Sequence, residues 1–190
     1  MIGMFPVGII KSGGESMRSA AAPRRRFLKM VVAAGAGLII PEWRPRRAEA
    51  AFRVGDIPSQ VTLSEVRGNS VTVPFDFKGQ VVLIHFWASW CPTCQGEMRT
   101  LESLYDLYGG KGVTPCSIGL GEKKETAVRY MKNMTISYPV LLDPDASTKK
   151  PFGIAGIPTY FVLDRESVIR HRILGKADRE GLGRIVRSLL

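Results

Sequence analysis

The clearest hydrophobic pattern in the chain lies at residues 81–88, which read Val-Val-Leu-Ile-His-Phe-Trp-Ala. A short apolar run rich in β-branched residues is typical of a strand that is buried on both faces of a sheet. From Pro92 to about Tyr108 the pattern changes, and apolar residues recur every three or four positions. This spacing predicts a helix that ends at Gly109-Gly110.

After residue 50 the chain continues to alternate between predicted strands and helices. Alternating apolar residues on both sides of Gly68-Asn69 predict a short hairpin. We expect further strands at residues 113–120, 138–142, 159–163 and 168–174, and further helices at residues 123–134, 146–152 and 178–190. This order predicts an α/β domain with a mixed central sheet flanked by helices and an N-terminal hairpin extension.

In the helix predicted at residues 123–134, three apolar side chains share one face, those of Ala127, Val128 and Met131. We therefore expect all three to pack against the core. Met98, Met131 and Met134 also lie at helical spacing, and we interpret them as core residues and not as a metal-binding group.

Residues 1–50 differ in composition from the rest of the chain and predict a leader segment. A basic stretch at residues 24–29 meets an apolar run of 11 residues, which is too short to span a bilayer comfortably. Ala48-Glu49-Ala50 has the small-x-small pattern of a signal-peptidase site. We expect a leader at residues 1–50, cleaved after Ala50 or retained as a membrane anchor, and a folded domain at residues 51–190.

The basic stretch at residues 24–29 reads Arg-Arg-Arg-Phe-Leu-Lys and resembles the twin-arginine export signal, although Pro23 stands where that pattern prefers Ser or Thr. The resemblance implies export in the folded state and a periplasmic or other extracytoplasmic location in a prokaryote. Met17 would begin a leader of more usual length, so we expect it to be the start of translation.

The net charge of +10 changes this picture little. Residues 1–50 hold 9 Lys/Arg and 3 Asp/Glu, whereas residues 51–190 hold 18 and 14, so most of the excess lies in the leader. The rest of the chain has no clustered basic stripe and no aromatic platform of the kind that binds single-stranded nucleic acid. We therefore expect no nucleic-acid partner.

The chemistry of the chain centres on Cys91 and Cys94, which follow the strand predicted at residues 81–88. Pro92 suits the first helical position, and Cys94 is expected one turn into the helix. The free N–H groups and the partial positive charge of a helix N-terminus would stabilise a Cys91 thiolate and lower its pKa. Cys94 would then lie close enough to attack a mixed disulfide formed on Cys91.

Two other interpretations of the pair are disfavoured but stay open. A zinc site needs two more ligands, and the chain offers only His85 and His171 and no second Cys-x-x-Cys. A structural disulfide that closes so short a loop contributes little stability compared with one that closes a longer loop. A redox-active dithiol at a strand-to-helix junction is the preferred interpretation.

Two motifs identify a family resemblance that covers the whole domain. Residues 86–94, Phe-Trp-Ala-Ser-Trp-Cys-Pro-Thr-Cys, resemble the active-site segment of the thioredoxin superfamily. Residues 156–161, Gly-Ile-Pro-Thr-Tyr-Phe, resemble its second hallmark, the loop with a cis proline that faces the cysteines. The order of elements from about residue 55 to 190 is similar to that of the TlpA/ResA-like branch. These are exported thiol-disulfide oxidoreductases with a thioredoxin-like fold, and several serve cytochrome c maturation.

The resemblance implies roles for four residues. Cys91 matches the attacking cysteine, Cys94 the resolving cysteine, and Pro158 the cis proline. Glu97 matches an acidic residue that the ResA-like branch carries three positions after the second cysteine. A partly buried carboxylate there could have a raised pKa and exchange a proton with Cys94, while the alternative is a solvated residue that the helix dipole favours.

Several neighbours of the pair are expected to support substrate binding or proton transfer. The cis bond would bring the backbone of Ile157 beside the cysteines to pair with an extended substrate segment. Trp90 is expected to cover the site or touch substrate, as are Pro92 and Thr93 between the cysteines. His85 departs from the family pattern, which has Asp or Asn there. We interpret it first as a hydrogen-bonded core residue, and second as a proton relay that titrates near neutrality.

These expectations add up to an exported enzyme that reduces protein disulfides, with apocytochrome c as a plausible substrate and a membrane electron donor implied by the family. Dithiol exchange needs no bound cofactor or metal, and we expect neither. One alternative runs the pair in reverse as a thiol oxidase. Another is a Cu(I)-binding delivery module in which Cys91, Cys94 and a histidine hold the metal. Cys116 is expected to be a buried and inert thiol.

Overall fold

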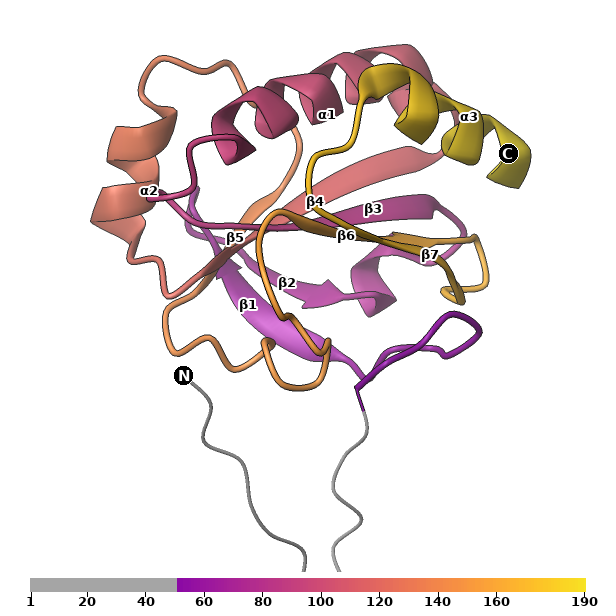
Figure 1. Cartoon of the computed structure of the whole chain (residues 1–190), viewed down its shortest axis with the longest axis horizontal. Coiled ribbons are helices and arrows are strands. Elements are labelled where there is room, and N and C mark those ends of the chain that lie inside the picture. The colour runs from indigo at the N-terminus through magenta and orange to yellow at the C-terminus, as the bar shows by residue number, and fades with distance from the viewer. Residues whose placement is uncertain (1–50) are drawn as a thin grey trace, which may run out of the picture. The chain divides into compact units, whose positions relative to one another are not determined.

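The computed structural model describes residues 51–190, and the leader predicted at residues 1–50 lies outside the described residues. In the described part, one mixed sheet has the strand order β2-β1-β5-β4-β3-β6-β7 (Figure 1). The strands are β1 (Val61–Glu65), β2 (Ser70–Val73), β3 (Val81–Trp87), β4 (Val113–Leu120), β5 (Val140–Asp143), β6 (Thr159–Leu163) and β7 (Ile169–Leu174). The helices are α1 (Cys94–Tyr108), α2 (Lys124–Met131) and α3 (Arg179–Leu189), with short 3₁₀ turns η1 (Phe75–Phe77) and η2 (Gly109–Lys111). The predicted α/β fold with its mixed sheet and N-terminal hairpin is confirmed.

The strand β3 lies inside the sheet and is buried along its whole length, as its apolar sequence predicts. It runs parallel to β4 and antiparallel to β6. Because successive side chains of a strand point to opposite faces, Leu83 and Trp87 belong to one core cluster and Ile84 and Phe86 to another. The sheet therefore separates two hydrophobic cores.

The first core lies between the sheet and the helices. Leu101 and Leu104 of α1 and Leu182 and Val186 of α3 are buried in it, and Figure 1 shows both helices on the same side of the sheet. Burial of a side chain of this size contributes about 1.5–3 kcal/mol to stability. This packing fixes the position of α1, which begins at the cysteine pair.

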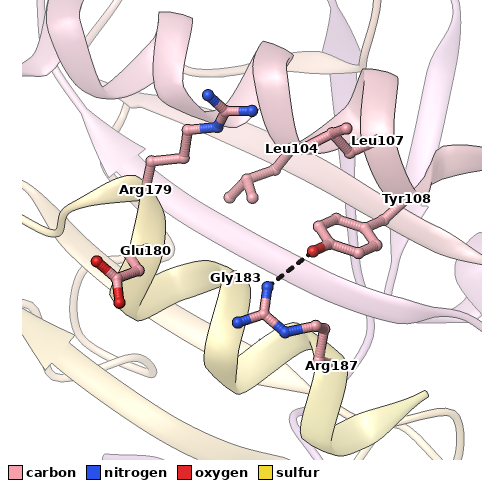
Figure 2. A pocket seen from close by; sticks show the side chains of 7 residues that line it. All are labelled: Leu104, Leu107, Tyr108, Arg179, Glu180, Gly183 and Arg187. Carbon is pink, nitrogen blue, oxygen red and sulfur yellow. Dashed lines mark hydrogen bonds between the residues drawn. The ribbon is translucent and has the colours of Figure 1, made fainter.

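A groove of about 320 Å³ lies between α1 and α3 and is lined by residues of both helices (Figure 2). The guanidinium of Arg187 in α3 donates a hydrogen bond to the Tyr108 hydroxyl of α1, with an N–O distance of 2.9 Å. This bond connects the two helices across the groove.

The second core is covered mainly by irregular segments. Phe77 of η1 and Phe152 and Ile154 of the connection between β5 and β6 pack on this face. The helix predicted at residues 146–152 is wrong, because these residues form turns. Pro151 has no N–H to continue a helical ladder.

The carboxylate of Asp143 instead organises the start of this connection. It accepts the backbone N–H groups of Ser147 and Thr148, each at 2.9 Å, and the hydroxyl of Ser147 at 2.9 Å. Side-chain bonds to nearby backbone compete with helix formation in this way.

Other element boundaries differ from prediction by a few residues. The helix α2 ends at Met131 and not at residue 134, because i→i−3 bonds at Lys132 and Met134 close its last turn. Val128 is exposed and not in the core, whereas Ala127 is buried as predicted. Met98 is buried, and Met131 and Met134 pack against the first core, as expected.

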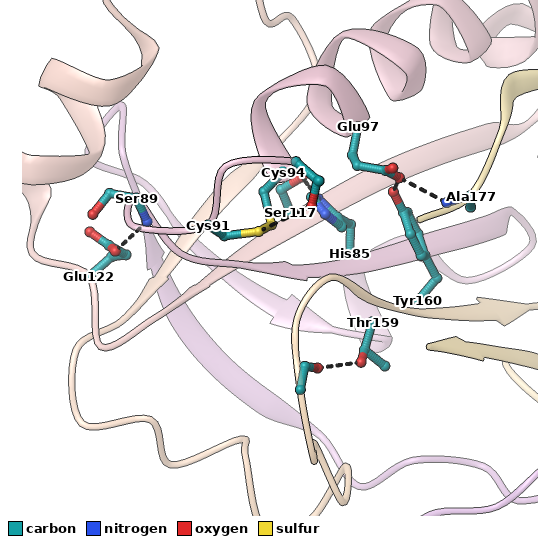
Figure 3. The surroundings of a disulfide bond; sticks show 12 residues. His85, Ser89, Cys91, Cys94, Glu97, Ser117, Glu122, Thr159, Tyr160 and Ala177 are labelled. Atoms are coloured by element: carbon teal, nitrogen blue, oxygen red, sulfur yellow. Dashed lines mark hydrogen bonds between the residues drawn. A yellow bond between two sulfur atoms is a disulfide. The ribbon is translucent and has the colours of Figure 1, made fainter. Parts of the chain in front are cut away.

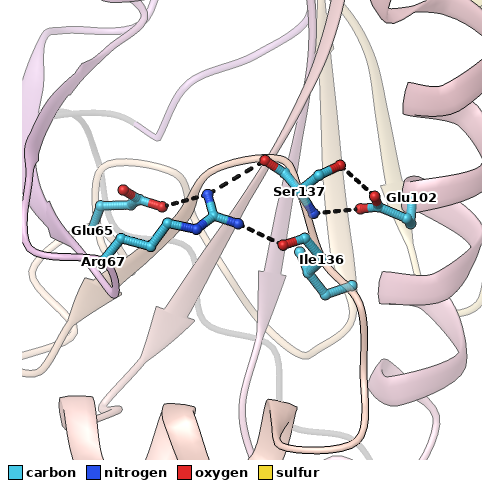
Figure 4. Close-up of polar contacts among 5 residues, drawn as sticks. All are labelled: Glu65, Arg67, Glu102, Ile136 and Ser137. Atoms are coloured by element: carbon cyan, nitrogen blue, oxygen red, sulfur yellow. Dashed lines mark hydrogen bonds and ion pairs between the residues drawn. The ribbon is translucent and has the colours of Figure 1, made fainter.

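A polar network attaches the hairpin to the rest of the domain (Figure 4). The strand β1 pairs with β5 at only two positions, so the ladder alone holds the hairpin weakly. Arg67 donates to the buried Glu65 carboxylate at 3.0 Å and to the carbonyl oxygens of Ile136 and Ser137. Ser137 N–H in turn donates to Glu102 of α1 at 2.9 Å. The network thus connects the hairpin to the segment between α2 and β5 and to α1.

We find no helix within residues 51–190 that combines the length and the apolar character needed to cross a membrane.

Candidate active site

The cysteine pair lies where β3 passes into α1 (Figure 3). Cys91 and Cys94 form a disulfide with a Cα–Cα distance of 5.5 Å, and the N–H of Cys91 closes the preceding turn onto the carbonyl of Ala88 at 3.0 Å. Cys94 is the first residue of α1 and Thr93 is its N-cap, so Pro92 lies before the helix and not at its first position. The predicted start of the helix was therefore too early by two residues.

The N-terminus of α1 can stabilise a negative charge, because its first N–H groups are not capped by a side chain. Thr93 makes no side-chain capping bond, so the first N–H groups of the helix have no side-chain acceptor there. The Thr93 hydroxyl instead lies 3.6 Å from the sulfur of Cys91. Free N–H groups and a nearby hydroxyl both stabilise a thiolate, which supports the prediction of a reactive Cys91.

Glu97 lies one turn after Cys94 and is almost completely buried, with 2% of its surface exposed. Its carboxylate accepts hydrogen bonds from the hydroxyl of Tyr160 on β6 and, at 3.3 Å, from the backbone N–H of Ala177 (Figure 3). Burial raises the pKa of Glu97, although the Ala177 N–H and the charge of Lys176 oppose the shift. A carboxyl held in this way is suited to proton exchange, and the solvated alternative is wrong.

His85 on β3 is completely buried between two neighbouring strands. Its ring stacks on that of Tyr160, its β6 partner, with centroids 4.8 Å apart, and its Nδ1 lies 3.2 Å from the hydroxyl oxygen of Ser117 on β4. Burial lowers the pKa of His85 to about 3, so the imidazole is neutral at neutral pH. The expected titration near neutrality is therefore wrong, whereas the description as a hydrogen-bonded core residue is confirmed.

The hydrogen-bond chain around His85 fixes its tautomer. Ser117 donates its hydroxyl proton to Tyr138, and Tyr138 donates to the carbonyl of Met98. Because Ser117 has only one proton to give, it accepts from Nδ1–H of His85. The lone pair of Nε2 has no hydrogen-bond partner among the described residues.

The loop before β6 meets the cysteine pair at the same edge of the sheet. Phe86 pairs with Thr159 in the antiparallel β3–β6 ladder, so Pro158 lies at the end of β3 that leads to Cys91. The Ile157–Pro158 bond is cis, as the resemblance implies. Ile157 packs against the core cluster that contains both cysteines. The two motifs are therefore brought together by the sheet, although they lie far apart in sequence.

The outer surface of the site is open. Trp90 is 74% exposed, and Pro92 and Thr93 are also exposed. A cleft of about 410 Å³ lies beside them, and its lining includes Glu97, Lys176 and residues at the start of α3. Substrate can thus approach the disulfide from the side of Pro92 and Thr93, next to the buried carboxylate.

Tyr160, Ala177 and Ser117 were not predicted from sequence as members of the site. Tyr160 and Ala177 hold Glu97, and Ser117 holds His85. Period-2 alternation from Pro158 along β6 could have placed Tyr160 on the face of the site. The contacts of Ala177 and Ser117 depend on strand pairing and on the loop before α3, and no local signal indicates them.

Cys116 is a free thiol on β4 and belongs to the second core, on the opposite face of the sheet from the pair. The expected burial is confirmed, and burial raises the pKa of the thiol, which disfavours the reactive thiolate. Residues 51–190 contain no group of three or more His, Cys, Asp or Glu side chains that could hold a metal ion. His171 lies on β7, beyond β6 from the strand that leads to the pair. Within the described residues, no His, Asp, Glu or further Cys thus joins the cysteine pair in a group of the kind that the Cu(I) alternative proposes.

Known proteins are similar to this chain in sequence and in fold. The redoxin family model matches residues 53–186. The chain is 25% identical over 141 residues to thiol-disulfide oxidoreductase ResA of Geobacillus thermodenitrificans, covering 74% of this chain and 80% of that protein. It is 29% identical over 143 residues to sporulation thiol-disulfide oxidoreductase A of Bacillus subtilis, covering 74% and 86%.

Solved structures of related proteins have a similar fold. The crystal structure of StoA from Bacillus subtilis matches with a TM-score of 0.58 and 27% identity, over 67% of this chain and 96% of that one. A thioredoxin-family thiol:disulfide interchange protein from Chlorobium tepidum matches with a TM-score of 0.64 and 27% identity, over 74% and 99%. The chain therefore belongs to the redoxin family, and it is a ResA-like thiol-disulfide oxidoreductase of the thioredoxin superfamily.

Proposed function

We propose that this enzyme is exported and reduces disulfides of proteins outside the cytoplasm, with Cys91 and Cys94 as its redox pair. The observation that carries the proposal is the placement of both cysteines at the N-terminus of α1, with the buried Glu97 carboxyl one turn beyond Cys94. This arrangement combines a stabilised thiolate, a second thiol within reach, and a group that can hold a proton.

The reaction begins from the reduced pair. The Cys91 thiolate attacks one sulfur of a substrate disulfide, which forms a mixed disulfide and releases the other substrate sulfur as a thiolate. Cys94 then loses its proton and attacks the Cys91 sulfur, which breaks the mixed disulfide and releases the second substrate thiolate. Two electrons pass to the substrate, and the enzyme is left with the Cys91–Cys94 disulfide.

Proton transfer at Cys94 is assigned to Glu97. Its raised pKa brings the carboxyl closer to the pKa of a thiol, which favours exchange between the two groups. The Tyr160 hydroxyl and the Ala177 N–H orient the carboxylate. His85 is assigned a supporting role: its buried imidazole stays neutral, and its unpartnered Nε2 can accept a hydrogen bond but does not take up the proton.

Substrate binding is assigned to the exposed rim of the site. The backbone of Ile157 before the cis peptide bond would pair with an extended substrate segment, in the manner of an added strand. Trp90, Pro92 and Thr93 would contact the residues that flank the substrate cysteine, because they are exposed around the pair.

The reducing direction and the location outside the cytoplasm go together. The family resemblance points to a membrane electron donor and to apocytochrome c as a substrate, and the leader at residues 1–50 is proposed to direct export. An oxidising compartment would soon exhaust the reduced pair unless electrons were supplied.

Measurement of the reduction potential of the Cys91–Cys94 pair tests the direction. We expect a value near that of thioredoxin, about −270 mV, at which the pair donates electrons. A value near that of strong periplasmic oxidants, about −120 mV, would contradict the proposed reducing direction and support the thiol-oxidase alternative.

Replacement of single cysteines tests the assignment of the pair. Cys91→Ser should abolish the reduction of a model protein disulfide, because it removes the attacking thiolate. Cys116→Ser is the matched control, since it changes a free thiol in the second core and should leave the rate within about threefold. An equal loss of the reduction rate in both variants would show that Cys91 is wrongly assigned as the attacking cysteine.

A further inference from the structure

Glu122, in the turn after β4, is a buried carboxylate that no role above includes. It is 4% exposed, and its Oε1 accepts the backbone N–H of Ser89 at 2.7 Å (Figure 3). Ser89 lies between the end of β3 and Cys91, so the bond connects β4 and the active-site turn across 33 positions of sequence. Charge-assisted hydrogen bonds of this length are stronger than neutral ones.

The packing around Glu122 leaves it little freedom. A Cβ atom at Gly119 would lie 3.0 Å from the Cβ of Glu122 and 3.2 Å from the indole ring of Trp87. The absence of a side chain at Gly119 therefore leaves the space in which the Glu122 stem packs. Trp87 also stacks on the ring of Tyr130, with centroids 4.9 Å apart. The Glu122 stem and the Trp87 ring therefore both lie against the backbone of Gly119 near the end of β4.

A buried carboxylate is an unusual acceptor for a single backbone N–H, because taking a charge out of water is costly. The turn has one further restraint of its own, the bond from Cys91 N–H to the Ala88 carbonyl.

We propose that Glu122 is a positioning residue for Cys91: through Ser89 it fixes the turn that presents the thiolate at the N-terminus of α1. The bond matters most in the reduced enzyme, in which the covalent connection between Cys91 and Cys94 is gone. This inference rests on the proposed function, because it assumes that Cys91 is the attacking residue.

The test compares three full-length variants with the wild type. Glu122→Ala removes the acceptor, and Glu122→Gln keeps an oxygen that can accept the Ser89 N–H. Asp164→Ala is the matched control, since Asp164 is 6% exposed and accepts the N–H groups of Glu166 and Val168 in the turn between β6 and β7. That turn lies at the other end of β6 from Pro158.

Two quantities are measured for each variant. The first is the pKa of Cys91 in the reduced protein, taken from the pH dependence of its alkylation by iodoacetamide. The second is the rate of disulfide reduction per folded molecule. We expect Glu122→Ala to raise the Cys91 pKa and to slow reduction about tenfold or more, because a small misplacement of a reacting group is costly. In Glu122→Gln, the Cys91 pKa and the reduction rate should both stay close to their wild-type values. Asp164→Ala should lower the melting temperature without changing the Cys91 pKa or the rate.

The proposal is overturned if Glu122→Ala leaves the Cys91 pKa and the rate per folded molecule at wild-type values, or if Asp164→Ala shifts both equally. If Glu122→Ala does not fold, Glu122→Asp replaces it; the shorter side chain keeps the charge but loses reach, and it must change both quantities in the same direction. Activity that survives in Cys91→Ser would instead refute the proposed function, so the two failures are distinguishable.

Discussion

At the scale of single residues, the site is defined by what surrounds each ionisable side chain. Glu97 and His85 are both buried, but their partners differ. Glu97 accepts two hydrogen bonds on its carboxylate, whereas His85 uses one ring nitrogen and leaves the other without a partner among the described residues. Burial disfavours the charged form of both groups, so it raises the pKa of Glu97 and lowers that of His85.

The raised pKa of Glu97 predicts a pH-dependent cost to stability. The folded protein binds this proton more tightly than the unfolded chain does, so the protonated carboxyl contributes stability that is fully present below the ordinary value of 4.5. That stability is lost as the pH rises through the raised pKa of the folded protein. Glu97→Gln is neutral at every pH and does not lose it.

We therefore expect the wild type to lose stability relative to Glu97→Gln as the pH rises from about 4.5 towards neutrality. The measurement is the free energy of unfolding of both proteins in urea at each pH. Glu102→Gln serves as the control, because its carboxylate is on the same helix but in an exposed contact with Ser137. A difference between Glu97→Gln and wild type that stays constant over this range would contradict the prediction.

The sequence could identify the site residues with their own chemistry but not the residues that hold them. Cys91, Cys94, Glu97 and Pro158 were predicted because each has a position in a local motif. Their neighbours Tyr160, Ser117 and Ala177 come from distant parts of the chain, and only the register of the sheet brings them together. The pKa of His85 was missed for the same reason, since it depends on complete burial between two strands.

At the scale of elements, long periodic segments were predictable and short connections were not. The apolar run of β3 and the spacing of α1 identified both elements, because each pattern is sustained over several residues. The turns at residues 146–152 were mistaken for a helix, because the contacts of Asp143 and the missing N–H of Pro151 outweigh local periodicity. The start of α1 was misplaced by two residues, a common error at helix ends.

The weak pairing of β1 with β5 makes the Arg67 network important for the hairpin. Arg67→Ala removes the donor to the buried Glu65 carboxylate and to two carbonyl oxygens. We expect a loss of about 1–3 kcal/mol in the free energy of unfolding measured in urea, because a buried acceptor is left without its partner.

Arg184→Ala is the matched control for Arg67→Ala. Arg184 forms an ion pair with Glu180 on the surface of α3, and both side chains are mostly exposed. Such pairs contribute little, so the change should stay within about 0.5 kcal/mol. Equal effects of the two substitutions would show that the network does not hold the hairpin.

At the scale of the whole molecule, the proposed export depends on residues 24–29. Replacement of Arg24 and Arg25 by lysine keeps the positive charge but removes the arginine pair that a twin-arginine signal requires. We expect the double variant to remain in the cytoplasm, as measured by cell fractionation of a C-terminally labelled protein.

The control for export replaces Lys29 by arginine, which keeps the arginine pair and the charge. Mapping of the N-terminus of the exported protein then tests cleavage after Ala50. Export of the Arg24→Lys/Arg25→Lys variant at the wild-type level would contradict the twin-arginine assignment.

The division of the domain into two cores has a consequence for the odd number of cysteines. Cys91 and Cys94 lie in the core between the sheet and the helices, and Cys116 lies in the core on the opposite face. The sheet thus separates the free thiol of Cys116 from the Cys91–Cys94 disulfide. Disulfide exchange between Cys116 and the pair would require the sheet to open. If the protein is exported after folding, as proposed, its third cysteine would therefore be protected from mispairing in an oxidising compartment.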